Sequence, residues 1–75
     1  MIARTFQFFR RQETGHERER RELLDALGDT RAELERARRN FDFAVEPELI
    51  EASVYQINAL QSRYAYLLRL LRESE

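Results

Sequence analysis

Apolar residues recur at α-helical spacing along two segments of the chain, and its single proline, Pro47, stands between them. In the first segment, alternating steps of four and three residues connect positions that lie on one helical stripe. The stripe consists of Leu23, Leu27, Thr30, Leu34, Ala37 and Phe41. Most of the other positions carry Glu, Asp or Arg. The pattern predicts one amphipathic helix over residues 16–42, with Gly28 off the stripe.

The second segment begins at Pro47, whose fixed φ suits the first position of a helix. Val45 and Ile50 have the spacing of a hydrophobic staple around this start. The apolar pattern continues to Glu73 and predicts a helix over residues 47–73. We interpret the carboxylates around the proline as groups that favour a helix start, rather than as a cation site. These are Asp42, Glu46, Glu48 and Glu51.

The two predicted helices have similar lengths, and only the corner at residues 43–46 connects them. Such helices fold back on each other, so we expect an all-α, antiparallel two-helix hairpin over residues 16–75. Residues 1–15 are left as an N-terminal tail. On the first helix, the expected contacts are Leu23, Leu27, Leu34 and Phe41. On the second, they are Ile50, Ile57, Leu60, Tyr64, Leu68 and Leu71.

The second predicted helix also has an apolar stripe opposite its main face, formed by Ala52, Tyr55, Ala59, Tyr66 and Leu70. A helix that is apolar on both sides is usually covered on both sides. The chain has 75 residues and no cysteine, and chains of this size often need a partner for stability. We therefore predict a homodimer that forms a four-helix bundle, with Tyr55, Ala59, Tyr66 and Leu70 at the protein interface. The alternative is that these side chains are scattered on a wet surface.

Catalytic motifs are absent from the sequence, which has one histidine and no Gly-rich phosphate loop. Glu13 and His16 have the spacing used in di-iron bundles, but the main face of the second helix has no glutamate beyond its first turn to complete such a site. We predict no catalytic residues, no metal, no cofactor and no small-molecule substrate. The predicted function is that of a self-associating interaction module whose protein partner is unknown.

The N-terminal tail supports an alternative function, because Arg4, Arg10 and Arg11 stand among phenylalanines. Such mixtures occur in proteins that bind nucleic acid or a membrane surface. The net charge of −1 argues against a general nucleic-acid-binding protein. No apolar run is long enough to cross a bilayer, and the start of the sequence lacks the pattern of a secretory signal. We expect a cytoplasmic protein.

The run from Asn40 to Glu73 strongly resembles the YaaL-like family of short bacterial proteins of unknown function. The matching residues are Phe41, Glu46, Pro47, Leu49, Ile50, Glu51, Arg63, Tyr64, Tyr66, Leu67 and Leu68. The family has Asp-Pro at the corner where this chain has Glu46-Pro47, and glutamate is the weaker N-cap. The resemblance implies a helical, cytosolic protein of Gram-positive-type bacteria, with a DNA-repair context for some relatives. It brings no catalytic residues.

Overall fold

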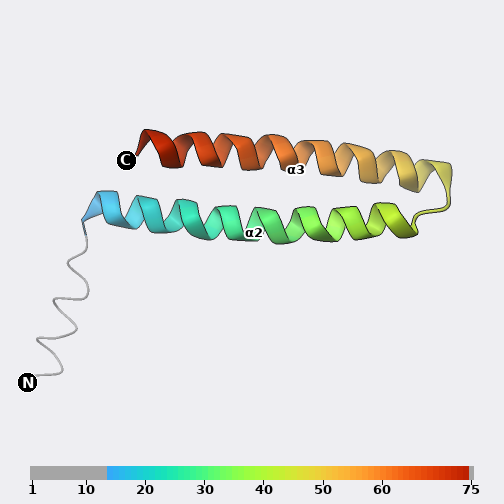
Figure 1. The fold of residues 1–75 in the computed structure, drawn as a ribbon, viewed down its shortest axis with the longest axis horizontal. Helices are drawn as coiled ribbons and strands as arrows, with labels where there is room; N and C mark the ends of the chain where they lie inside the picture. The colour runs from blue at the N-terminus through green and yellow to red at the C-terminus, as the bar shows by residue number, and fades with distance from the viewer. Residues whose placement is uncertain (1–13, 75) are drawn as a thin grey trace, which may run out of the picture.

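The computed structural model describes residues 14–74, in which two α-helices pack side by side as an antiparallel hairpin (Figure 1). Helix α2 spans Gly15–Phe43 and helix α3 spans Pro47–Glu73. Helix α2 extends one residue beyond the predicted range at each end, and α3 has the predicted bounds. The all-α hairpin is confirmed, while residues 1–13 of the predicted tail lie outside the described part of the chain.

Helix α2 begins with a side-chain cap that the sequence interpretation did not identify. Thr14 is the N-cap, and its Oγ1 accepts a 3.0 Å hydrogen bond from the backbone N–H of Glu17. Thr-x-x-Glu at this position is the sequence signature of a capping box. The acidic side chain of Glu17 also lies in the first turn, where the helix dipole favours negative charge. The start of α2 is therefore fixed by two local effects.

The corner between the helices depends on backbone hydrogen bonds. The N–H of Ala44 donates to the carbonyl of Phe41 at 3.2 Å. Glu46 is the N-cap of α3 but makes no side-chain capping bond, in keeping with the weak capping ability of glutamate. Val45 is 82% exposed, so it packs against very little. The predicted staple between Val45 and Ile50 is therefore wrong.

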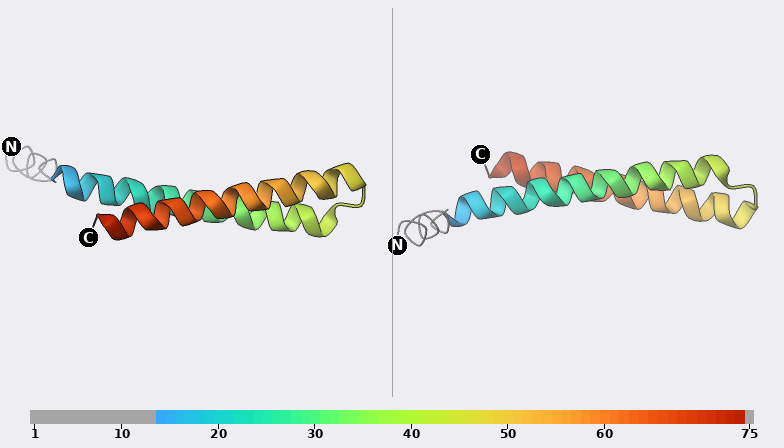
Figure 2. Two further views of the ribbon diagram at one scale, coloured as in Figure 1. Left: turned by 90° about the horizontal axis from the view of Figure 1, so that it is seen from above. Right: turned by 90° about the horizontal axis from the view of Figure 1, so that it is seen from below.

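The interior of the hairpin is a narrow seam whose buried positions repeat every seven residues. The buried residues are Leu27, Thr30, Leu34 and Ala37 in α2, and Ser53, Leu60 and Leu67 in α3. At its centre, Leu34, Ala37 and Leu60 form a cluster against which Ile57 packs. A seven-residue repeat favours left-handed coiling of two helices. The views in Figure 2 show α2 and α3 crossing at a shallow angle.

Most of the predicted contact residues line this seam. Leu27, Leu34 and Leu60 are buried, and most of the others are half-buried. Phe41 was expected in the core but is 40% exposed. Small side chains occupy the tightest positions instead, including Thr30 and Ala37 at 1% exposure. Two helices leave only a thin interior, which small residues fill while large apolar side chains remain partly in solvent.

Candidate protein-interaction surface

Helix α3 carries far less charge than α2. Between Ala52 and Leu68 its only charged residue is Arg63, whereas more than half of the residues in α2 are charged. The outward positions of α2 are therefore well suited to water. A helix with so little charge around its circumference is typical of one covered on more than one side. Helix α2 covers only the seam side of α3.

The structure places three of the four predicted interface residues on the exposed side of α3. Tyr55 is 68% exposed and Tyr66 is 50% exposed, and Ala59 is also exposed. They belong to a set of exposed positions spaced three or four residues apart, which we call the outer stripe. The outer stripe consists of Ala52, Tyr55, Ala59, Ser62, Tyr66 and Arg69. Spacing of this kind puts all six positions on one helix face.

Arg69 at the end of the outer stripe contacts its neighbours along the helix. Its guanidinium carbon lies 5.4 Å from the centre of the Tyr66 ring, within the range of a cation–π contact. Its Nη1 also lies 3.9 Å from Oε1 of Glu73. The cation is therefore held over the aromatic ring.

Leu70, the fourth predicted interface residue, lies in a different environment. It is half-buried and lines a hollow of about 350 Å³ together with Leu23 and Glu19 of α2. Leu70 therefore flanks the seam at the open end of the hairpin, rather than the middle of the outer stripe. Its remaining exposed surface still lies beside the stripe, because Leu70 is four residues from Tyr66.

The closed end of the hairpin exposes apolar side chains that the sequence interpretation did not assign to a surface. Phe43 is 82% exposed and Leu49 is 57% exposed. Both line a hollow of about 410 Å³, to which Ala52 of the outer stripe also contributes. Phe43 lies off the apolar stripe of α2, and Leu49 off the main face of α3. These two departures from the pattern are the sequence signal for this patch.

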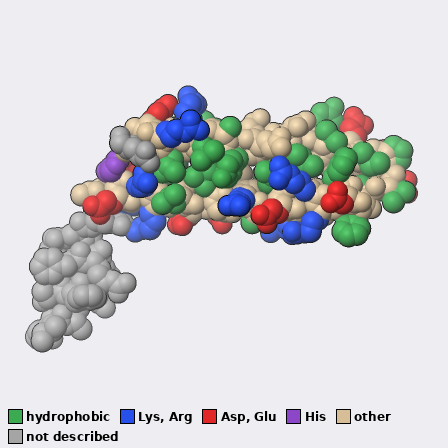
Figure 3. Space-filling view, in the orientation of Figure 1, with side chains coloured by type: hydrophobic (Ala, Val, Ile, Leu, Met, Phe, Trp, Pro, Cys, Tyr) green, Lys and Arg blue, Asp and Glu red, His purple; other side chains and the backbone are tan. Residues whose placement is uncertain are grey.

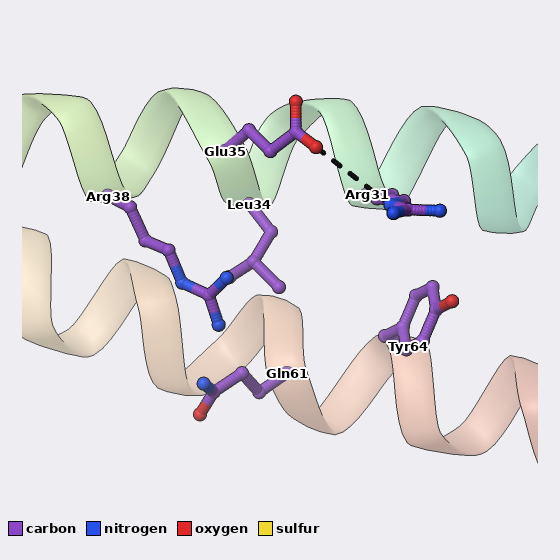
Figure 4. Close-up of a pocket in the computed structure, with 6 residues that line it drawn as sticks. All are labelled: Arg31, Leu34, Glu35, Arg38, Gln61 and Tyr64. Atoms are coloured by element: carbon purple, nitrogen blue, oxygen red, sulfur yellow. Dashed lines mark ion pairs between the residues drawn. The ribbon is translucent and has the colours of Figure 1, made fainter.

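A second type of surface lies on one flank of the seam, where a hollow of about 480 Å³ opens between the helices (Figure 4). Arg31, Arg38, Gln61 and Tyr64 surround it, with Leu34 and Glu35. Arg31 Nε lies 3.8 Å from Glu35 Oε1 within α2, and both side chains are largely exposed. Such a pair contributes at most about 1 kcal/mol. This flank is polar and charged, in contrast to the outer stripe.

One face of the whole molecule shows how these side chains are distributed (Figure 3). Hydrophobic side chains gather along the line between the two helices, and arginines and acidic side chains surround them. The apolar surface beside the seam is thus bordered by charge on this face. This border limits how closely a second apolar surface can approach there without burying charged groups.

A family model described as a protein of unknown function (DUF2508) matches residues 6–75. The chain belongs to this DUF2508 family. The match confirms the prediction that the chain belongs to a small family of unknown function, and the resemblance to the YaaL-like family is consistent with it. No curated protein and no solved structure matches the chain. The function of this DUF2508 protein is therefore inferred from its own residues.

Some of the predicted features of this DUF2508 protein lie beyond the described residues. Arg4, Arg10 and Arg11 are among them, as is Glu13 of the Glu13–His16 pair. Within residues 14–74, no group of three or more His, Cys, Asp or Glu side chains is placed to hold a metal ion. In the same part of the chain, no helix is both long and apolar enough to span a membrane. The outer stripe remains the candidate site that the structure describes in full.

Proposed function

We propose that this protein is a self-associating interaction module that acts without catalysis and binds other protein surfaces through the exposed side of α3. The observation that carries the proposal is the nearly uncharged run from Ala52 to Leu68, which exposes two tyrosines to solvent. Tyrosine provides a large contact area at a low cost in conformational entropy and is enriched at protein interfaces. Charged residues are depleted at the centres of such interfaces, which matches this face.

The small interior of the hairpin also supports the proposal. Within residues 14–74, the buried hydrophobic residues are Leu27, Leu34, Ala37, Leu60 and Leu67. Chains of this size often bury too little apolar surface to be stable without further support, and self-association is one form of support. Two hairpins that associate bring four helices together, and two-fold symmetry is the most common arrangement of such pairs.

The experiment is a measurement of mass in solution by sedimentation equilibrium over a range of concentrations. The wild-type protein is expected to have the mass of a dimer. Tyr55→Glu combined with Tyr66→Glu places two charges in the apolar face, so this variant is expected to sediment as a monomer. A matched control, Gly28→Glu with Ala32→Glu, adds the same charge to exposed positions of α2 and is expected to remain a dimer.

Two results would contradict the proposal. A wild-type protein that is monomeric at every concentration would rule out self-association. A tyrosine double variant that has the wild-type mass would place the interface elsewhere. Circular dichroism of both variants checks that the helices are retained, so that loss of the dimer is not confused with unfolding.

A further inference from the structure

We propose that the outer stripe of α3 binds the outer stripe of a second copy of this chain, with the two α3 helices antiparallel. The two-fold axis passes between Ala59 and Ser62. This inference depends on the proposed function, because it specifies the partner and the register of the same surface. It follows from three properties of α3, which are its spacing, the order of its side-chain sizes, and its charge distribution.

The spacing of the outer stripe is that of a second coiled-coil seam. Its members follow one another at steps of three and four residues, so each position recurs after seven. The seam with α2 follows the same repeat through Ser53, Leu60 and Leu67. The two seams follow the same seven-residue repeat but occupy different positions around α3. These positions lie on nearly opposite sides of the helix. Helix α3 can therefore pack on α2 and on a second helix at the same time.

The sizes of the four central side chains of the outer stripe read nearly the same in both directions, whereas its two ends, Ala52 and Arg69, differ. The two small residues, Ala59 and Ser62, lie at its centre, and Tyr55 and Tyr66 lie at equal distances on either side. When two copies run antiparallel about this centre, Ala59 meets Ser62 of the second copy and Tyr55 meets its Tyr66. Small central side chains let the two backbones approach closely. The tyrosine pairs then close the contact at both ends.

The charges beside the outer stripe are complementary in the same register. On one side of the outer stripe, Glu51 pairs with Arg72 of the second copy. On the other side, Leu49 pairs with Leu70 of the second copy. Each of these contacts occurs twice because of the two-fold symmetry. In the same register, the acidic first turn of α3, which contains Glu48, lies beside the basic last turn of α3 in the second copy.

Other arrangements of two copies bring like charges together. A parallel pair of α3 helices places Arg69 of the outer stripe beside Arg69 of the second copy, and leaves Glu51 and Arg72 near opposite ends of the pair. Pairing through the flank of the seam lined by Arg31 and Arg38 encloses four arginines between the hairpins. The antiparallel register avoids both conflicts. It orders the four helices as α2–α3–α3–α2, in a layer with the two α3 helices inside, and this arrangement differs from the four-helix bundle expected from the sequence.

The register is tested by disulfide cross-linking, since the chain has no cysteine of its own. The variants are Tyr55→Cys and Tyr66→Cys, oxidised separately and as an equimolar mixture. The mixture is expected to give the 55–66 cross-link between copies. Neither variant alone is expected to cross-link, because position 55 of the two copies lies about 16 Å apart along the helix axis, and so does position 66. A disulfide requires Cα atoms within about 7 Å.

A charge exchange tests the same register with both tyrosines in place. Glu51→Arg alone and Arg72→Glu alone are each expected to weaken the dimer roughly threefold to tenfold, because two like-charge contacts replace two attractive ones. The double variant Glu51→Arg with Arg72→Glu is expected to regain the wild-type dissociation constant. Each of the two substitutions also places an unfavourable charge near an end of the α3 dipole, and these two effects add within one helix in the double variant. A restored dissociation constant therefore identifies contact between copies.

The outcomes separate the register from the proposed function. A monomeric wild-type protein overturns the proposed function and the register together. A dimer whose single cysteine variants each cross-link with themselves overturns the antiparallel register and leaves self-association standing. A double charge variant that dimerises more weakly than either single variant also overturns the antiparallel register and leaves self-association standing. Cross-linking confined to the mixture, with affinity restored by the charge exchange, supports the register.

Discussion

Leu34 of α2 and Leu60 of α3 meet in the buried cluster at the centre of the hairpin, together with Ala37. Leu34 is 9% exposed and Leu60 is 7% exposed. The half-buried side chain of Ile57 packs against this cluster. These contacts join α2 to α3 at the centre of the hairpin.

The first prediction is that Leu34→Ala lowers the free energy of unfolding by about 2–4 kcal/mol, because it leaves a cavity where a buried leucine was. Val45→Ala is the matched control, since Val45 is largely exposed at the corner and should cost less than about 0.5 kcal/mol. Urea titrations followed by circular dichroism measure both values. A large loss from Val45→Ala would mean that the staple with Ile50 forms in solution.

The second prediction concerns Thr30, whose hydroxyl is buried in the seam. Within the described residues, its Oγ1 has no hydrogen-bond partner, and the residue is 1% exposed. A buried polar atom without a partner costs about 1–3 kcal/mol. Thr30→Val keeps the shape and removes the hydroxyl, so it is expected to raise the free energy of unfolding by about 1 kcal/mol. Thr30→Ser, which keeps the hydroxyl and removes a methyl group, should lower it.

The third prediction concerns Gly28, in the middle of α2. A Cβ at this position meets nothing within 4 Å, and the residue is exposed. Glycine in a helix interior is about 1 kcal/mol less favourable than alanine. Gly28→Ala is therefore expected to raise the melting temperature without a change in dimer mass. Gly15→Ala, at the first position of α2, should have a smaller effect because that residue lies at the helix terminus. Equal shifts for both variants would contradict this account.

The sequence was sufficient to predict the hairpin because its local signals agree. The stripe from Leu23 to Phe41 and the proline at position 47 each predict the same helices as the structure. The partial exposure of Phe41 was not predictable from periodicity, because a stripe identifies a face but not how much of it a second helix covers. The cap at Thr14 was present as a Thr-x-x-Glu pattern, but residues 1–15 were assigned to the N-terminal tail.

The candidate site was predictable in part, for a related reason. Tyr55, Ala59 and Tyr66 are exposed as expected, because positions opposite a seam follow directly from the helical repeat. Leu70 lies beside α2 because coiling of the helices carries the seam toward it at the open end. Single-helix geometry at 100° per residue does not include this drift. Over a helix the length of α3, the drift is large enough to move a residue from one face to its edge.

The last prediction links stability to self-association. A partner that binds only the folded state stabilises it by mass action, so the melting temperature of a dimer rises with protein concentration. We expect this rise for the wild-type protein, because covering the outer stripe adds to the small interior of the hairpin. The variant with Tyr55→Glu and Tyr66→Glu should melt at one temperature at all concentrations, and Gly28→Glu with Ala32→Glu should behave like the wild type. Differential scanning calorimetry over a hundredfold range of concentration measures the three curves. A wild-type melting temperature that does not change across this range would show that the folded hairpin gains nothing from a second copy, and that its thin seam is sufficient alone.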